Sequence, residues 1–273
     1  MTRRWMFRLV PVALAAVVML YQFVISPKYT NPETGRTAHL GLTTQQESAL
    51  GMQSFQQVIS QSDVVSSGPE AEQVRRVAAR LAAVTGPYAK DFEWQVAVVR
   101  DPQVNAFCLP GGKICVYTGI LAVTKTDAGL ATVMGHEMAH ATSHHGAERM
   151  FKQNMTQTAM MGVQGSMGGM DYQQQQMVMG LLGAGAKFGV LLPFSRDHES
   201  EADKVGLMYM ARAGYDPRES VNFWKRMAES SQGKQQPEFM STHPVHETRI
   251  RQLEAWIPEV MDEYEAAAKP AER

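Results

Sequence analysis

Two histidines and a glutamate form the most informative group of residues, in the order His136-Glu137-Met138-Ala139-His140. On a helix, positions four apart share one face, so both imidazoles can reach the same ion. Neutral imidazole is a good ligand for zinc. Glu137 lies about 100° round the helix from His136, where its carboxylate can take a proton from a zinc-bound water. The spacing therefore predicts a catalytic zinc site with Glu137 as the base, although three fixed residues can also match by chance.

A hydrolytic zinc site needs a third protein ligand and one open position, and the acidic stretch after residue 194 offers candidates. Residues 195–213 are expected to form one helix. Counted at about 100° per residue, Glu199 and Asp203 share its mostly apolar face, whereas Glu201 falls on the solvated face with the basic residues. Because buried carboxylates need partners, we expect Glu199 to be the third zinc ligand. We expect Asp203 to accept the second N–H of a ligating histidine and so to fix its tautomer. A buried salt bridge is the alternative, but no Lys or Arg shares this face.

Other histidines near these motifs are expected to have structural roles. His144 lies one helical turn beyond the motif, but a zinc ion with three protein ligands has no need of it. His144 and His145 are therefore expected to be surface or capping residues. His198 points about 100° away from the third ligand, and His39 lies in a linker region.

The elements that must position these residues follow from hydrophobic periodicity and turn signals. They are helices at 43–60 and 70–84, a strand at 94–99, two strands around a Leu-Pro-Gly-Gly turn within 105–117, and helices at 126–145, 195–213, 217–230 and 244–256, the last ending before Pro258. We expect residues 43–260 to form one α+β, mostly helical domain. Residues 261–273 are expected to be a loose charged tail.

An uncharged apolar run, Leu9–Ile25, follows three arginines at the N-terminus. As a helix it spans about 26 Å, at the lower limit of a membrane crossing. The positive-inside tendency keeps the N-terminus in the cytoplasm and exports the rest. We therefore expect residues 1–27 to be an uncleaved membrane anchor and residues 28–42 a linker. A cleaved signal peptide is the alternative, although Ser26-Pro27-Lys28 is not a small-x-small cleavage site.

The two cysteines, Cys108 and Cys115, flank the Pro-Gly-Gly turn. They face each other if Gly111-Gly112 is a two-residue turn, whereas Cys108 faces Lys113 if Pro110-Gly111 is the turn centre. Both registers stay open, and so does a disulfide in an oxidising compartment.

Several of these stretches resemble the HtpX-like, CAAX-prenyl-protease-type zinc metallopeptidases, family forty-eight of the metallopeptidases. They are Asn105–Gly112, the His136–His140 motif, the E-x-x-x-D spacing from Glu199 to Asp203, and Ser241-Thr242-His243-Pro244 with Arg249, which matches the family's T-H-P-x-x-x-x-R. The resemblance covers about residues 45–258 and is nearest the branch of the periplasmic BepA and LoiP and the mitochondrial Oma-type peptidases.

The resemblance implies a gluzincin-type fold with one catalytic zinc ion. Its small sheet would have an edge strand, here within 105–117, that lies over the active site and can bind an extended peptide. It also implies that His243 comes near the zinc. There it could stabilise an oxyanion, or fill the fourth zinc position until it swings away. A capping or packing role is the alternative, and His246 is expected to be a solvated helix residue.

The expected function is that of a zinc-dependent endopeptidase acting through zinc-activated water. Its expected substrates are misfolded or unassembled cell-envelope proteins. Its expected location is the bacterial inner membrane, facing the periplasm on the N-terminal anchor, or the periplasm itself if that segment is cleaved. The net charge of −1 gives no indication of a nucleic-acid partner. The alternatives are a chaperone-like envelope assembly factor with a blocked or silent zinc site, and a prenyl-protein processing enzyme, which would need a multi-span membrane chamber.

Overall fold

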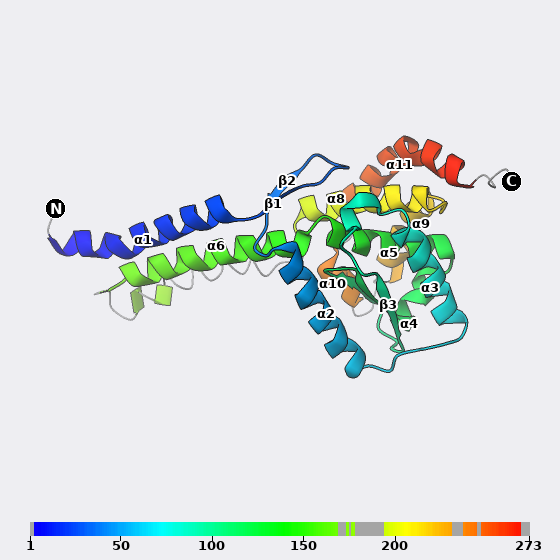
Figure 1. Ribbon diagram of the computed structural model, residues 1–273, viewed down its shortest axis with the longest axis horizontal. Coiled ribbons are helices and arrows are strands. Elements are labelled where there is room, and N and C mark those ends of the chain that lie inside the picture. The colour runs from blue at the N-terminus through cyan, green and yellow to red at the C-terminus, as the bar shows by residue number, and fades with distance from the viewer. Residues whose placement is uncertain are drawn as a thin grey trace. The chain divides into compact units, whose positions relative to one another are not determined.

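The computed structural model describes residues 3–168, 173–174, 176–177, 194–230, 237–244 and 247–268 (Figure 1). The helices are α1 (Arg3–Ile25), α2 (Thr44–Ser60), α3 (Pro69–Ala82), α4 (Thr118–Thr124), α5 (Asp127–Thr142), α6 (His145–Ser166), α8 (Arg196–Arg212), α9 (Glu219–Ser230), α10 (Glu238–Thr242) and α11 (Glu247–Ala268), with a 3-10 turn at Gly86–Ala89. The strands are β1 (Lys28–Thr30), β2 (Thr37–His39), β3 (Gln95–Val99), β4 (Ala106–Leu109) and β5 (Lys113–Tyr117). The expected class, α+β and mostly helical with a small sheet, is confirmed.

The chain divides into two compact units. One comprises Met1–Asn31, Gly35–Thr43 and Gly146–Leu192, and the other comprises Pro32–Thr34, Thr44–His145 and Pro193–Arg273. All the residues that the sequence singles out for chemistry belong to the second unit.

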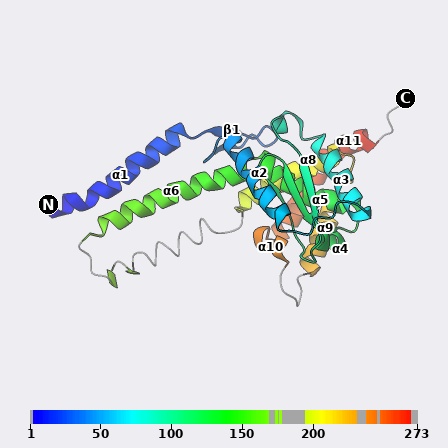
Figure 2. The same ribbon diagram turned by 60° about the horizontal axis from the view of Figure 1, so that its bottom comes forward.

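In the first unit, helices α1 and α6 run side by side (Figures 1 and 2). They approach closely because α6 carries glycine at the contact: a Cβ on Gly162 would lie 2.5 Å from the Ala15 Cβ. The segment expected to be a linker contains the antiparallel pair β1–β2, in which Tyr29 faces Ala38. Gly35, with φ of 72°, closes the connection between these two strands.

The apolar run Leu9–Ile25 is helical, as part of α1. Within the described residues, however, no helix is both long enough and apolar enough to cross a membrane.

In the second unit, a three-stranded sheet has the order β3-β5-β4. Strands β3 and β5 are parallel, whereas β4 and β5 are antiparallel. Helix α5 packs against the sheet through β4 and against α3, α8 and α9. It is buried without interruption from Gly129 to Thr142. The site histidines therefore lie on a helix that is enclosed on all sides.

The register of β4 and β5 differs from both expected registers. Leu109 pairs with Lys113, so three residues rather than two connect the strands. Cys108 pairs with Ile114, and Cys115 pairs with Phe107. Because successive residues of a strand point to opposite faces, the two cysteines lie on opposite faces of the sheet. Both are free thiols, and this register brings no disulfide within reach.

Two helical expectations are wrong. Helix α11 does not end before Pro258 but continues to Ala268. Tertiary contacts stabilise the helix on both sides of the proline, because Leu253 and Val260 are buried and Glu263 forms an ion pair with Arg212 at 2.8 Å. The tail expected to be loose from residue 261 is therefore helical as far as it is described. The predicted helix at 126–145 is in fact two helices, because the chain turns at His144, which has φ of 55°.

Helices α5 and α8 meet backbone to backbone. A Cβ on Gly206 of α8 would lie 2.9 Å from the His136 backbone nitrogen, and a Cβ on Gly135 would lie 3.1 Å from the Gly206 carbonyl oxygen. At Gly206 this distance leaves no room for a Cβ unless the backbone shifts, and at Gly135 a Cβ would be in very tight contact. The crossing therefore fixes α8 directly against the turn of α5 that carries His136.

We predict that Gly206→Ala lowers the free energy of unfolding by about 1–3 kcal/mol, the usual effect of forcing atoms into a packed core. A loss of stability is diagnostic of the close contact, because alanine in a helix interior otherwise stabilises the protein by about 1 kcal/mol relative to glycine. The measurement is chemical denaturation of the purified protein. Gly146→Ala is the control, since a Cβ there meets nothing within 4 Å. A Gly206→Ala protein as stable as the control would contradict this account of the crossing.

Candidate active site

Helix α5 presents its two motif histidines to one point. It begins after Thr126, whose side chain accepts a hydrogen bond from the Gly129 backbone N–H, as a helix N-cap does. The His136 Nε2 and His140 Nε2 atoms lie 3.1 Å apart, and both side chains are buried. The expected i and i+4 geometry thus brings the two ring nitrogens together.

Helix α8 brings Glu199 to the same point from one turn inside its N-terminus. Ser195 caps this helix by accepting from the His198 backbone N–H. The carboxylate of Glu199 lies between the histidines, with Oε1 at 3.3 Å from His140 Nε2 and Oε2 at 3.4 Å from His136 Nε2.

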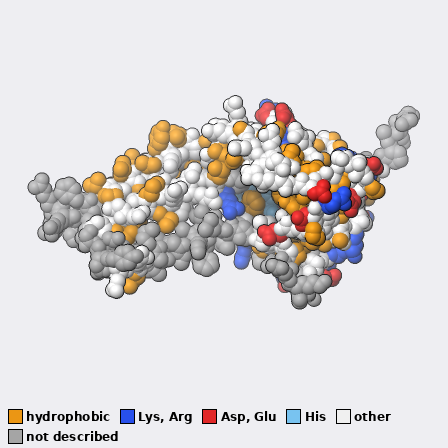
Figure 3. Space-filling view, turned by 90° about the horizontal axis from the view of Figure 1, so that it is seen from below, with side chains coloured by type: hydrophobic (Ala, Val, Ile, Leu, Met, Phe, Trp, Pro, Cys, Tyr) orange, Lys and Arg blue, Asp and Glu red, His pale blue; other side chains and the backbone are white. Residues whose placement is uncertain are grey.

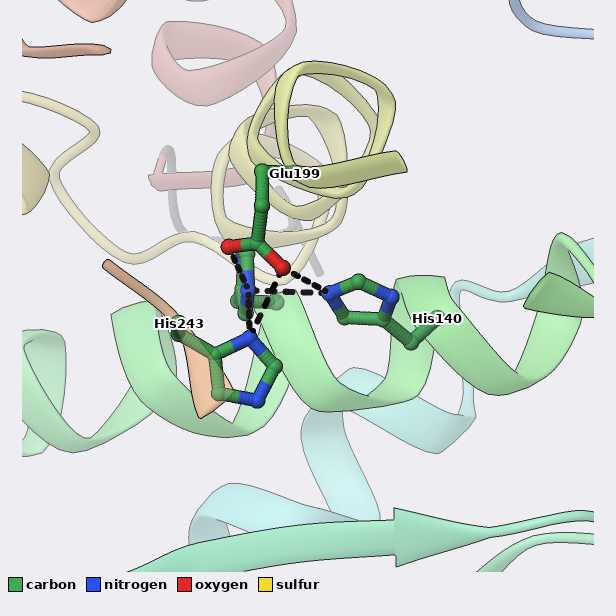
Figure 4. A group of neighbouring side chains, drawn as sticks. His140, Glu199 and His243 are labelled. Atoms are coloured by element: carbon green, nitrogen blue, oxygen red, sulfur yellow. Dashed lines mark hydrogen bonds and ion pairs between the residues drawn. The ribbon is translucent and has the colours of Figure 1, made fainter. Parts of the chain in front are cut away.

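His243 completes the group from a third segment (Figure 4). It directly follows the short helix α10, and its backbone N–H donates to the Phe239 carbonyl. The His243 ring stacks on Phe239 at a centroid distance of 4.8 Å. Its Nδ1 lies 3.0 Å from Glu199 Oε1 and 3.2 Å from His136 Nε2. His246 lies outside the described residues.

The four side chains fit a zinc ion. One ligand atom from each of His136, His140, Glu199 and His243 lies within 4.8 Å of the other three. Ligand atoms about 2.0–2.1 Å from a tetrahedral zinc ion are about 3.3 Å from one another. The distances of 3.0–3.4 Å in this group match that spacing. In addition, Glu199 Oε2 is buried, with the Arg249 guanidinium 2.8 Å away and His136 Nε2 at 3.4 Å. The donor set is therefore that of a metal site.

The electrostatics of these side chains favour the ligand form of His140 and Glu199, whereas they favour the protonated form of His136. Burial lowers the pKa of His140 well below its usual value, which keeps that imidazole neutral. Burial opposes ionisation of Glu199, but hydrogen bonds from the three histidines outweigh it and lower the pKa of that carboxyl. Burial would also lower the pKa of His136, but hydrogen bonds to Asp203 and Glu199 raise it to about 9.

Asp203 and Arg249 lie behind His136. Asp203 Oδ1 is 3.0 Å from His136 Nδ1, the ring nitrogen that faces away from the group. Arg249 donates two hydrogen bonds to the Asp203 carboxylate, from Nε at 2.6 Å and Nη2 at 2.7 Å. The Arg249 guanidinium also lies 2.8 Å from Glu199 Oε2 and 3.9 Å from the centre of the Trp224 ring. Burial raises the pKa of Asp203, but Arg249 and His136 together lower it, so the carboxylate is ionised.

Glu137 lies beside the group and not in it. Its Oε1 is buried without a hydrogen bond and lies 3.3 Å from His243 Nε2. Burial raises the pKa of Glu137, while a backbone hydrogen bond from Cys108 on β4 lowers it in part. The edge strand thus contacts the carboxylate that the sequence predicts to move a proton.

Sequence reasoning missed part of this site. Glu201 was expected on a solvated face and His145 at the surface, yet both are buried and hydrogen-bonded to each other at 2.8 Å. His144 is also buried, against Glu47. These pairs join segments far apart in the sequence, and helical periodicity carries no signal for them. Arg249 was named only through the family motif. A buried Asp203 with no basic residue on its own helix face was the one signal that a cation had to come from elsewhere.

The sequence profile of Peptidase family M48 matches residues 69–257. Individual relatives include mitochondrial metalloendopeptidase OMA1 of Schizosaccharomyces pombe, 39% identical over 78% of this chain and 61% of the relative. The same-named protein of Saccharomyces cerevisiae is 36% identical over 63% of this chain and 50% of the relative. The beta-barrel assembly-enhancing protease of Yersinia pestis is 29% identical over 80% of this chain and 45% of the relative.

The chain thus spans about half of the length of these relatives. The matched region contains every residue of the four-donor group, together with Glu137, Asp203 and Arg249. Because the family profile matches more than half of the length of this chain, the chain belongs to Peptidase family M48.

Proposed function

We propose that this protein is a zinc-dependent endopeptidase. The observation that carries the proposal is the buried group of His136, His140, Glu199 and His243 with the carboxylate of Glu137 beside it. Three neutral imidazoles and one carboxylate are ligands typical of zinc. Membership of Peptidase family M48 supports the assignment as a metallopeptidase, and the relatives described above are metalloendopeptidases or proteases.

Each residue of the site has a distinct task in peptide hydrolysis. His136, His140 and Glu199 would hold the ion, which when bound activates water and polarises the substrate carbonyl. Glu137 is the group that moves the proton: it takes a proton from the attacking water and gives it to the leaving amine. Its raised pKa, caused by burial, suits a carboxylate that must be protonated in mid-reaction. Asp203 holds His136 in the tautomer whose Nε2 lone pair points into the group.

The edge of the sheet supports an extended peptide as substrate. Within the described residues, β4 pairs only with β5, so its other side faces no strand. The same strand contacts Glu137 through the Cys108 backbone. A substrate strand added to β4 would therefore run past the catalytic carboxylate and be held mainly by its main chain. Recognition of this kind suits unfolded proteins of varied sequence.

Misfolded or unassembled proteins of the cell envelope are the substrates that we propose. Helix α1 bears large apolar side chains toward solvent, among them Leu14, Leu20 and Val24, with exposed fractions of 62, 64 and 69%. Figure 3 shows hydrophobic side chains along the part of the molecule that contains α1. An exposed apolar surface of this kind supports attachment to a membrane, and the location that we propose is the periplasmic face of the bacterial inner membrane.

His243 favours a second function for the same site, that of a chaperone-like assembly factor with a blocked zinc. Its Nδ1 occupies the fourth corner of the donor group, the position that a hydrolytic zinc site leaves open. The two functions are compatible if His243 moves away when substrate binds, and we propose that it acts as a removable fourth ligand.

Replacing His136, His140 or Glu199 by Ala should abolish zinc binding and activity together. Glu137→Gln should retain zinc and lose about 100-fold or more in rate, because only proton transfer is removed. Elemental analysis and cleavage of unfolded casein measure the two properties on the same preparations. A Glu137→Gln protein that cleaves casein at the wild-type rate would refute the proposed enzyme, and a Glu199→Ala protein with full zinc would refute the ligand assignment.

Asp203→Ala should weaken zinc affinity about 10- to 100-fold, the usual loss when a partner of a ligating histidine is removed. Asp203→Asn should weaken it less, because the amide oxygen can still accept from His136 Nδ1. Competition with a chromogenic chelator gives the affinities, and Asp197→Ala on the exposed side of the same helix is the control. Equal zinc affinities for Asp203→Ala and the control would show that Asp203 pairs with Arg249 but does not support His136 as a ligand.

His243→Ala should raise basal proteolysis several-fold, because the fourth ligand position becomes free for water and substrate. Thr242→Ala, which changes the neighbouring residue at the end of α10, should leave the rate unchanged. Casein cleavage is compared after zinc content has been matched. A fall of about 100-fold in His243→Ala would instead assign His243 to oxyanion stabilisation, and an unchanged rate would leave it only a packing role.

A further inference from the structure

The turn between α5 and α6 brings a further histidine to the metal group. On one continuous helix, His145 would lie about 140° round from His140 and point away from it. Helix α5 instead ends at Thr142, and His144 adopts the left-handed conformation with φ of 55°. Helix α6 then begins at His145, whose ring folds back so that its Nδ1 lies 2.8 Å from His140 Nδ1.

The other nitrogen of this ring contacts a buried carboxylate. His145 Nε2 lies 2.8 Å from Glu201 Oε2, and the Thr34 hydroxyl donates to Glu201 Oε1. His145 is wholly buried and Glu201 is 6% exposed. The His198 ring stacks on His145 at a centroid distance of 4.4 Å and an interplanar angle of 18°. The imidazole is thus held at both nitrogens and on one face.

Only one placement of protons lets His140 present a lone pair to the donor group. With its Nε2 free, His140 must carry its proton on Nδ1, which then donates to His145 Nδ1. His145 must in turn carry its proton on Nε2, which donates to the Glu201 carboxylate. In this series His140 donates to His145 and His145 donates to Glu201, so the orientation of each ring depends on that of the next.

We propose that His145 and Glu201 are positioning residues that hold His140 in its metal-binding tautomer and orientation. This inference rests on the proposed function, in which His140 is a metal ligand. The two ligating histidines of α5 are then supported in different ways. His136 is hydrogen-bonded directly to a carboxylate, Asp203, at 3.0 Å, whereas His140 reaches its carboxylate, Glu201, through an intervening imidazole.

The test compares variants of His145 and Glu201 by metal affinity and by the visible spectrum of the cobalt-substituted protein. His145→Phe keeps a flat ring against His198 but removes both nitrogens, and should weaken zinc affinity about 10- to 100-fold. It should also shift the cobalt absorption bands, because the His140 ring is no longer fixed. His145→Asn, whose amide oxygen can replace Nδ1 as acceptor, should recover part of the affinity.

Glu201→Gln retains an acceptor for His145 and should remain near wild type, whereas Glu201→Leu should resemble His145→Phe. His144→Asn is the control for disturbance of the turn. It breaks the buried contact with Glu47 without touching His140, and asparagine tolerates positive φ. The control should show the wild-type spectrum and affinity.

Nitrogen-15 NMR of histidine-labelled, zinc-loaded wild-type protein tests the proton placement without any substitution. The expected result is a neutral His145 protonated at Nε2 and a His140 protonated at Nδ1. A proton on His145 Nδ1, or an unchanged affinity and cobalt spectrum in folded His145→Phe, would overturn this inference. In either case wild-type zinc binding would remain, whereas failure of the proposed function would show as a wild-type protein that takes up no zinc.

Discussion

The contact between Gly135 of α5 and Gly206 of α8 is the constraint on which the site depends. Backbone meets backbone there, so the distance between the two helices is set by peptide groups and not by flexible side chains. The next residue of α5, His136, faces the carboxylates of Glu199 and Asp203 from α8. A separation larger by one methyl group would move two carboxylates away from the imidazoles at once. The two glycines at this crossing thus position the candidate metal site as directly as the proposed ligands do.

Much of the group was accessible to sequence reasoning because helical periodicity is a local property. The spacing of His136 and His140 places two nitrogens on one face, and the structure has them 3.1 Å apart. The expected burial of Glu199 and Asp203 on one face of α8 also agrees with the structure. Helical periodicity does not show which residue of a remote segment contacts a given side chain. Glu201 faces away from Glu199 on the helix, but that side is covered by His145 and Thr34, which come from remote segments.

The fold shows the same division between local and remote determinants. Helices α2, α3, α8 and α9 follow the expected ranges to within a few residues, since apolar spacing defines them, with a Ser195 cap at the start of α8. The end of α11 was misplaced because Pro258 is a strong local stop signal that tertiary packing outweighs. The β4–β5 turn was misjudged because two glycines, both with positive φ, permit a three-residue connection as readily as a two-residue one. Burial of the turn against α2 lies outside what a single hairpin sequence specifies.

The Arg249 ion pairs have a consequence for the charge of the interior. Three buried carboxylates, those of Glu137, Glu199 and Asp203, lie within hydrogen-bond or ion-pair distance of the histidine group, and Arg249 is the one guanidinium among the described residues that contacts them. With neutral imidazoles and ionised carboxylates, Arg249 cancels one of these three negative charges and leaves two beside the donor group, in a medium that solvates charge poorly, and buried Glu201 lies one imidazole further away. A divalent cation would balance the two charges that lie beside the donor group, whereas a monovalent ion would balance only one of them. The guanidinium thus lowers the negative charge that a bound ion would have to balance.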